Sequence, residues 1–154
     1  MTPESFQSGP SGGKGGNAFT DDIPAAGVKV QAVFIEHGDW VNALQFFYTD
    51  GSSTDLHGKT SGGSPTTLLF KPDETLLEVY GSYGDYINSV TLRTNVQTYG
   101  PFGKVGGGDD KTYRYQALDE GTEVIGLFGA CGEYLDSFGV IRRRNRANGA
   151  ARSA

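Results

Sequence analysis

The sequence predicts an all-β fold in a single domain. Its 154 residues are the length of one domain and are enough to enclose a core. The composition combines 24 Gly, 8 Tyr and 9 Phe with a single Met, which is typical of short strands joined by tight turns. No window carries a helical apolar stripe, so we expect no helix longer than one turn.

Strand-like segments follow one another at short intervals along the chain. Each is rich in β-branched or aromatic residues, shows a rough period of two, and is bounded by Gly, Pro, Asp or Ser. In chain order, the predicted strands are residues 28–36, 43–49, 66–71, 76–81, 87–94, 112–117, 123–129 and 137–142.

A five-residue motif occurs three times: GDWVN at 38–42, GDYIN at 84–88 and GEYLD at 132–136. Successive copies begin 46 and 48 residues apart, from 38 to 84 and from 84 to 132, and each is followed by a small residue and a strand. Glycine runs keep the same step, with SGGKGG, SGG and GGG beginning at Ser11, Ser61 and Gly106. The chain therefore contains three copies of one β unit of about 47 residues.

The combined motifs resemble those of the jacalin-related lectins. The shared features are the glycine-rich first loop, G-x-x-x-D near the C-terminus, and YGPFG at 99–103. The Q-x-W of β-trefoils and the Q-x-D-x-N-x-V-x-Y of the monocot β-prism are absent. The resemblance runs from about Ser11 to Arg142 and implies a β-prism I fold, with three four-stranded Greek-key sheets around a pseudo-threefold axis.

The resemblance also implies one primary carbohydrate-binding pocket. Its residues would be Gly16, Gly132, Glu133, Tyr134 and Asp136, with the backbone N–H groups of Gly16, Glu133 and Tyr134 facing the sugar. A carboxylate can accept hydrogen bonds from two neighbouring hydroxyls, and glycine permits both unusual backbone angles and close approach of a ligand. The alternative is a hairpin turn in which Asp136 only caps its own backbone.

The first two copies of the motif end in Asn instead of Asp, and an amide offers one acceptor oxygen and no charge. We therefore expect these secondary sites to bind weakly or not at all. Their residues are Gly38, Asp39, Trp40, Asn42 and Gly63 in one copy, and Gly84, Asp85, Tyr86, Asn88 and Gly107 in the other. The motif aromatics, including Tyr134, either face sugar or pack over the base of the loop.

The expected function is reversible binding of mannose- or glucose-type glycans, because the resemblance associates galactose binding with cleavage beside the pocket and no processing signal precedes Gly12. We expect neither catalysis nor a cofactor nor a metal, since a glycine-rich turn offers no cleft for two carboxyls. One shallow site binds weakly, so a homodimer or higher homo-oligomer through an outer sheet is expected. The alternative is a β-prism interaction or structural module that has lost sugar binding.

Charge and chain ends complete the expectations. All 18 Asp and Glu residues lie within residues 1–141, whereas five of the 13 Lys and Arg residues lie within residues 142–154. Residues 1–141 are therefore acidic, and nucleic-acid binding is not expected. Residues 1–10 are expected to form a leader, 11–142 the domain, and 143–154 a basic disordered tail. Without an apolar segment or a signal peptide, we expect no membrane insertion and a cytoplasmic or nucleocytoplasmic location, with non-classical secretion left open.

The remaining reactive residue types give no further site. Cys131 is the only cysteine, so no internal disulfide can form, and its neighbours carry no cation that would activate the thiol. His37 and His57 are isolated and are expected at the surface.

Overall fold

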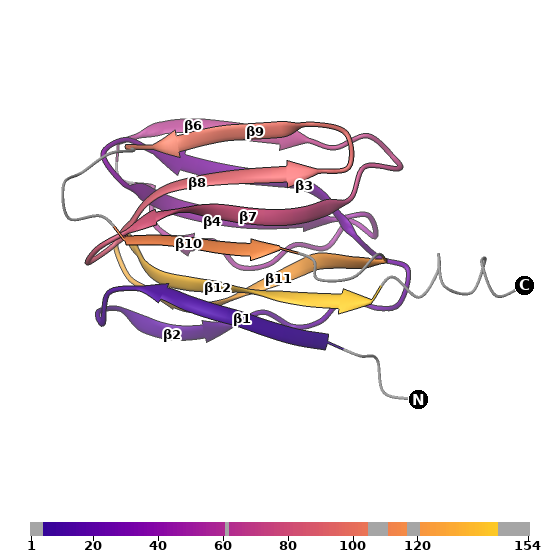
Figure 1. Cartoon of the computed structure of the whole chain (residues 1–154), viewed down its shortest axis with the longest axis horizontal. Helices are drawn as coiled ribbons and strands as arrows, with labels where there is room; N and C mark the ends of the chain where they lie inside the picture. Colours follow the sequence, from indigo (N-terminus) through magenta and orange to yellow (C-terminus); the bar gives the residue numbers. More distant parts are fainter. Residues whose placement is uncertain (1–4, 61, 105–110, 117–120, 145–154) are drawn as a thin grey trace, which may run out of the picture.

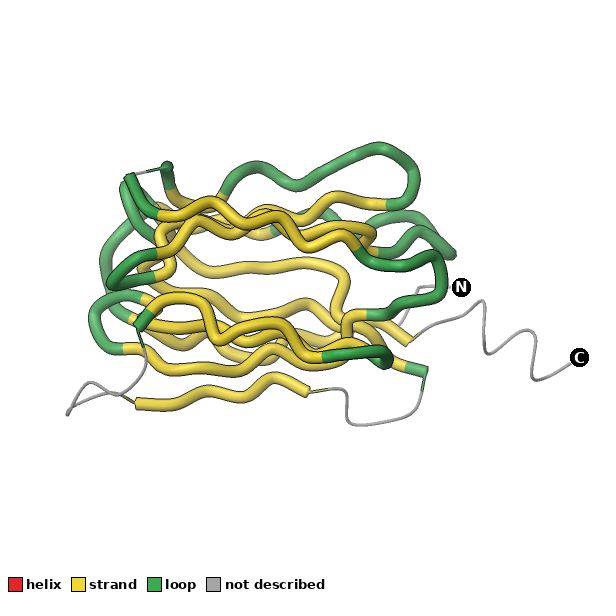
Figure 2. The backbone as a smooth tube through the Cα atoms, turned by 90° about the horizontal axis from the view of Figure 1, so that it is seen from above, coloured by secondary structure: helices red, strands yellow, loops and turns green. Residues whose placement is uncertain are grey.

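The computed structural model describes residues 5–60, 62–104, 111–116 and 121–144, and within them the chain forms twelve strands and no helix. The strands make three four-stranded antiparallel sheets, and the connecting loops gather at the ends of the strands (Figures 1 and 2). Among these residues there is accordingly no helix capable of crossing a bilayer. The predicted all-β fold with three sheets is confirmed.

Each sheet consists of a long central hairpin flanked by two edge strands. The first sheet has the order β1 (Ser5–Gly12), β12 (Leu135–Arg144), β11 (Thr122–Cys131) and β2 (Asn17–Thr20). The second has the order β5 (His57–Gly58), β4 (Val41–Tyr48), β3 (Val30–His37) and β6 (Ser64–Leu69). The third has the order β9 (Thr98–Gly103), β8 (Ile87–Thr94), β7 (Leu76–Tyr83) and β10 (Lys111–Gln116).

Alternate side chains of the central hairpins point into one shared core. Ile35 and Phe46 of the second sheet and Phe138 of the first are at most 1% exposed. Tyr113 and Tyr115 of β10 meet the Phe138 ring edge-on, with ring centroids 5.3 and 5.9 Å apart. Complete burial of a side chain of this size stabilises the fold by about 1.5–3 kcal/mol, so the core joins the three sheets into one domain.

Three glycines mark the equivalent ends of β1, β5 and β9, one in each sheet. Gly12, Gly58 and Gly103 all have positive φ, and a Cβ at these positions would lie 2.0–2.3 Å from the carbonyl oxygen of the last motif residue in the same sheet. No other residue type fits this close approach of two backbones. A positive-φ glycine thus ends the equivalent edge strand of each sheet, and of these three glycines only Gly12 lies within a glycine run of the sequence repeat.

Four strands, β1, β2, β5 and β9, have no counterpart among the predicted strands. All are edge strands, and two of them contain proline, Pro10 in β1 and Pro101 in β9. Proline lacks the N–H donor of a central strand but is tolerated at a sheet edge. Weak strand composition therefore concealed these four strands, whereas the central hairpins and the edge strands β6 and β10 match predicted segments.

The first and last strands, β1 and β12, extend beyond the expected boundaries of the domain. β1 begins at Ser5, which lies opposite Arg143 of β12 although the two residues are at opposite ends of the described chain (Figure 1). Arg142 and Arg143 are 6% and 3% exposed, so the expectation that a disordered tail begins at Arg143 is wrong. The Arg143 guanidinium donates to the carbonyl oxygens of Pro24, Ala25 and Val28 and so holds the connection between β2 and β3.

Candidate functional site

The three motif copies form three equivalent turns, between β3 and β4, β7 and β8, and β11 and β12. In each turn the first glycine donates its N–H to the carbonyl oxygen of the motif aromatic residue. The N···O distances are 2.9 Å for Gly38, 2.9 Å for Gly84 and 3.0 Å for Gly132. The sequence repeat therefore corresponds to a repeated loop geometry.

The aromatic residues of the three turns meet one another. The ring centroids of Trp40, Tyr86 and Tyr134 are 5.2–5.4 Å apart in all three pairs. Such tilted and edge-on contacts are the favoured geometry of aromatic pairs. The rings thus pack together across the three repeats and fix the turns relative to each other, while Trp40 stays 37% exposed and the two tyrosines are half-buried.

Asp136 lies directly beneath the first glycine-rich loop, residues 13–16. The N–H of Gly13 donates to the Asp136 carbonyl oxygen at 2.9 Å. A Cβ at Gly15 would lie 2.7 Å from Asp136 Oδ2, and one at Gly16 would lie 2.7 Å from Oδ1. Gly16 also has positive φ. The loop and the last motif therefore meet as expected, and only glycine permits the approach without displacing the carboxylate.

The Asp136 carboxyl is a poorly solvated acceptor. Its residue is only 9% exposed, and burial raises the pKa of the carboxyl, an effect that its own backbone N–H partly offsets. Within the described part of the chain no other residue donates a hydrogen bond to this carboxylate. A ligand that brings hydroxyl donors to it would replace missing solvation and strengthen its ionised form.

The first glycine of the motif does not have the backbone role expected of it. Gly132, like Gly38 and Gly84, has no positive φ, so another residue could adopt its conformation. A Cβ at Gly132 would meet nothing within 4 Å. What glycine provides at this position is open space beside the turn. Glu133 is exposed next to it.

The second sheet has the same arrangement, but its polar group is already engaged. Asn42 donates from Nδ2 to Glu36 Oε1 at 3.0 Å, and both residues are buried. Gly63 lies against the Asn42 amide, with a Cβ there 2.8 Å from Nδ2. Asp39 is exposed at the turn. The Asn42 amide therefore has a structural partner that the motif alone did not reveal.

The third sheet provides only part of its expected site. Asn88 is half-buried and Asp85 is exposed, and a Cβ at Gly84 would lie 3.7 Å from Asn88 Nδ2. Gly107, expected to complete this site, lies outside the described residues.

A groove of about 560 Å³ runs between the glycine-rich loop of the first sheet and the motif turn of the third. Gly13 touches the backbone of the opposite turn, since a Cβ on it would lie 2.1 Å from the Asp85 carbonyl oxygen. The side chains lining the groove are those of Lys14, Tyr83, Asp85 and Lys111. A groove between repeats is not visible in any single motif, which is why sequence inspection missed it.

The other reactive side chains, Cys131 and His57, are half-buried or buried within the fold. Burial raises the pKa of the half-buried Cys131 thiol, which makes it a poor nucleophile. His57 is 3% exposed, stacks on Phe19 and hydrogen-bonds Asp21 at 2.7 Å, so its expected surface position is wrong. The described residues contain no group of three His, Cys, Asp or Glu side chains that could hold a metal ion.

Comparison with known proteins agrees with this architecture. Residues 8–141 match the jacalin-like lectin domain family. The chain is 30% identical to a mannose/glucose-specific lectin of Parkia pendula, aligning 93% of this chain with 33% of that protein. It is 33% identical to the jacalin-related lectin Calsepa of Calystegia sepium, aligning 88% of this chain with 94% of that protein. The chain thus spans about a third of the Parkia lectin but nearly all of Calsepa.

Among solved structures, the fold is similar to a mannose-specific jacalin-related lectin from Morus nigra in complex with mannose. The TM-score is 0.78 at 26% sequence identity, covering 92% of this chain and 96% of that one. The family match covers most of the chain, and the fold of this chain is similar to that of the Morus lectin. The chain therefore belongs to the family of jacalin-like lectin domains.

Proposed function

We propose that this domain binds mannose- or glucose-type glycans reversibly at Asp136, without performing chemistry on them. The observation that carries the proposal is the buried Asp136 carboxylate, which lacks other donors in the described chain and lies under two glycines that leave no side chain over it. The names of the Parkia and Morus relatives, which specify mannose or glucose, support the choice of sugar.

In this mechanism the carboxylate accepts hydrogen bonds from two neighbouring sugar hydroxyls. The backbone N–H groups of Gly16, Glu133 and Tyr134 donate to other sugar oxygens, and the open space beside Gly132 admits the ring. Each hydrogen bond to a charged group contributes about 1.5–3 kcal/mol, and desolvation of the sugar offsets much of this. Millimolar affinity for a monosaccharide, about −4 kcal/mol, is therefore expected.

The groove beside Asp136 extends this site toward oligosaccharides. It begins at Gly12 and Gly13, which belong to the same loop that covers the carboxylate. A second sugar residue in the groove would reach Tyr83 and Asp85, adding an aromatic face and a further acceptor. Binding of a dimannoside more tightly than a monosaccharide follows from these extra contacts.

The Asn42 copy is not proposed as a site, because its amide already bonds Glu36. The Asn88 copy retains at most a weak role, since an amide cannot replace the paired acceptors of a carboxylate. Multivalency must then come from self-association, and a homodimer is part of the proposal.

Calorimetric titration with methyl α-mannoside and methyl α-galactoside tests the function. The decisive variant is Asp136→Asn, which preserves shape but removes the charge and one acceptor, and it should weaken mannoside binding at least about tenfold. Asp39→Asn is the matched control, because it changes an exposed acid in the equivalent turn of the second sheet. Its affinity should equal that of the unmodified protein.

No measurable mannoside binding, or binding that survives Asp136→Asn unchanged, would contradict the proposal. The first result would instead favour an interaction module that keeps the fold without a sugar site.

A further inference from the structure

The edge strand β2 connects the first glycine-rich loop to the first sheet. It has only four residues, Asn17–Thr20, and begins directly after Gly16. On one side it pairs with the end of β11, where Asn17 lies opposite Cys131. A short strand with one paired neighbour has few backbone hydrogen bonds to fix it. The position of the loop over Asp136 therefore depends on what holds the other side of β2.

The other side of β2 is held by His57 of the second sheet. The imidazole stacks on the Phe19 ring, with the centroids 3.7 Å apart and the two planes inclined by 12°. Its Nε2 lies 2.7 Å from Oδ1 of Asp21, the residue that follows β2, and both side chains are at most 5% exposed. An ionised carboxylate only accepts hydrogen bonds, so Nε2 is the donor in this contact.

Asp21 extends the contact from His57 to β11. Its Oδ2 accepts the N–H of Leu127 at 2.9 Å, and its own N–H donates to the Leu127 carbonyl oxygen at 2.9 Å. The carboxylate thus uses one oxygen for the imidazole and the other for the backbone of the neighbouring strand. An amide could not accept both hydrogen bonds equally, because it has one acceptor oxygen.

The strand β5, which carries His57, is fixed to the second copy of the motif. It pairs with β4, and a Cβ at Gly58 would lie 2.0 Å from the Asn42 carbonyl oxygen. The Gly58 N–H faces the sulfur of Cys131 and favours its ionised form. β5 therefore lies between the second motif turn and the pair of strands that supports the first loop.

We propose that His57 and Asp21 are positioning residues for the carbohydrate site. Together they hold β2 against β11 and so fix Gly16 over the Asp136 carboxylate. The fit is close, since a Cβ at Gly16 would lie 2.7 Å from Asp136 Oδ1 and 2.8 Å from the Cys131 nitrogen. If β2 moved away from β11, the Gly16 N–H would leave the sugar while Asp136 stayed in place. The inference rests on the proposed function, because it concerns the same site.

Calorimetry with methyl α-mannoside tests this role in the full chain carrying His57→Phe. This variant keeps a ring that can stack on Phe19 but removes the donor to Asp21. Its mannoside affinity should fall about three- to tenfold, because the hydrogen bond from Gly16 to the sugar is weakened. His57→Gln places an amide donor near the position of Nε2 and should restore part of the affinity.

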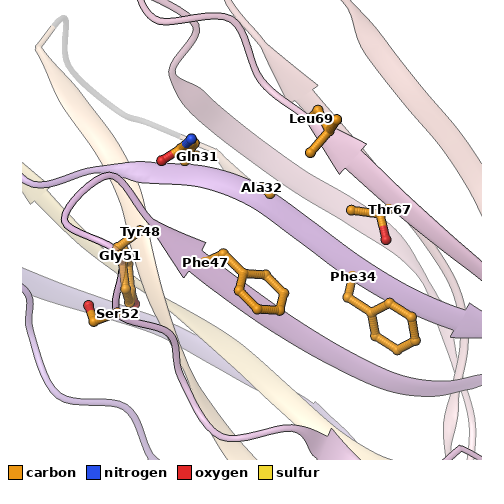
Figure 3. A pocket seen from close by; sticks show the side chains of 9 residues that line it. All are labelled: Gln31, Ala32, Phe34, Phe47, Tyr48, Gly51, Ser52, Thr67 and Leu69. Atoms are coloured by element: carbon orange, nitrogen blue, oxygen red, sulfur yellow. The ribbon is translucent and has the colours of Figure 1, made fainter.

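Tyr48→Phe is the matched control, because it also removes a buried hydrogen bond between the second and first sheets. The Tyr48 hydroxyl donates to the Ile125 carbonyl oxygen at 2.6 Å. Tyr48 ends β4 beside Gly51, remote from the motif turn that begins this strand (Figure 3). Both phenylalanine variants should lower the melting temperature by about 3–8 °C. Only His57→Phe should lose mannoside affinity, which separates positioning from general stability.

Reaction of Cys131 with dithiobis(nitrobenzoate) gives a second measurement that needs no sugar. Cys131 is the only cysteine of the chain and pairs with Asn17 where β2 begins. In His57→Phe the reaction should be at least about fivefold faster, because local opening of β2 and β5 exposes the thiol. Tyr48→Phe should react at the rate of the unmodified protein.

Asp21→Asn and the double variant with His57→Phe complete a cycle. Because the two residues act through one contact, the double variant should bind mannoside about as weakly as either single variant. Losses that add would contradict this pairing.

Equal mannoside affinity in His57→Phe and Tyr48→Phe overturns the inference, and so does an equal rate of thiol reaction in the two variants. If the unmodified protein binds no mannoside, the proposed function fails instead, and the thiol rates alone decide whether His57 holds β2 in place.

Discussion

Three glycines provide a controlled test of how tightly the first loop lies against Asp136. Gly62, in the equivalent loop of the second sheet, has positive φ but nothing within 4 Å of a Cβ. Gly15 has no positive φ, but its Cβ would lie 2.7 Å from the carboxylate. Gly16 combines both conditions, and its Cβ would also lie 2.8 Å from the Cys131 backbone nitrogen. Alanine at each position separates backbone conformation from crowding.

The expected costs follow from these contacts. Gly62→Ala should lower the free energy of unfolding by about 1–2 kcal/mol, because alanine disfavours the left-handed conformation. The smaller conformational entropy of the unfolded chain offsets about 0.4–1 kcal/mol of this loss. Its melting temperature should fall by about 3 °C, since 1 kcal/mol corresponds to about 2–4 °C at this chain length. Gly16→Ala adds about 1–3 kcal/mol for crowding against backbone, giving about 2–4 kcal/mol in total. Gly15→Ala should cost about 1 kcal/mol, because only a side-chain carboxylate must yield.

Sugar affinity should group Gly15→Ala with Gly16→Ala and separate both from Gly62→Ala. Gly15→Ala and Gly16→Ala both crowd Asp136 and should lose at least about tenfold in methyl α-mannoside affinity by calorimetry, or about 1.4 kcal/mol. Gly62→Ala should bind as the unmodified protein does. If Gly16→Ala melts at the same temperature as Gly62→Ala and binds mannoside equally well, the close approach of loop and carboxylate is refuted.

Three further predictions concern the site and its support. Trp40 is the only tryptophan and its ring lies 5.4 Å from that of Tyr134, so saturating mannoside should change its fluorescence emission, and no change should occur in Asp136→Asn. Burial raises the pKa of Asp136, so its carboxylate becomes protonated at a higher pH than an ordinary Asp side chain, whose pKa is near 3.9. Mannoside affinity measured by calorimetry should therefore fall on acidification above that pH, although protonation of this group stabilises the fold. An affinity that does not change with pH contradicts this prediction. Arg143→Ala should lower the free energy of unfolding, measured by denaturant titration, by about 3–5 kcal/mol. Arg93→Ala is the control, because Arg93 belongs to a partly exposed ion pair, and it should lower this free energy by about 1 kcal/mol or less. Equal losses in the two variants would show that the carbonyl contacts of Arg143 are unimportant.

The signs behind the pH prediction run in opposite directions for folding and binding. Burial makes ionisation of Asp136 less favourable in the folded chain than in the unfolded chain, so stability from this group is greatest below its unfolded pKa and declines as pH rises through the folded pKa. Sugar hydroxyls need the ionised form as acceptor, so binding improves over the same interval. A protein that weakened in both respects on acidification would indicate other titrating groups.

The central hairpins were predictable because their side chains must alternate between core and surface. The segment 87–94, for example, coincides with β8. The edge strands β6 and β10 were also predicted, but β1, β5 and β9 were not, because the two residues of β5 carry no pattern and β1 and β9 contain glycine and proline. An edge strand needs only backbone pairing on one side, so its composition is weakly constrained.

The site divides in the same way. The family resemblance predicted that the first glycine-rich loop contacts Asp136. The contact among Trp40, Tyr86 and Tyr134 could have been inferred from the repeat, because equivalent residues near a threefold axis approach one another. The bond from Asn42 to Glu36 could not, since Glu36 lies outside the motif. Burial of Arg143 was concealed by the basic residues that follow it in the sequence.

The pairing of β1 with β12 also imposes an order on how the protein matures. During synthesis β1 emerges first but has no partner until β12 leaves the ribosome, so the second and third sheets can form while the first waits. The proposed carbohydrate site, which joins residues from both ends of the described chain, appears only in that last step. Retention on a mannose resin would then report completed folding of the first sheet.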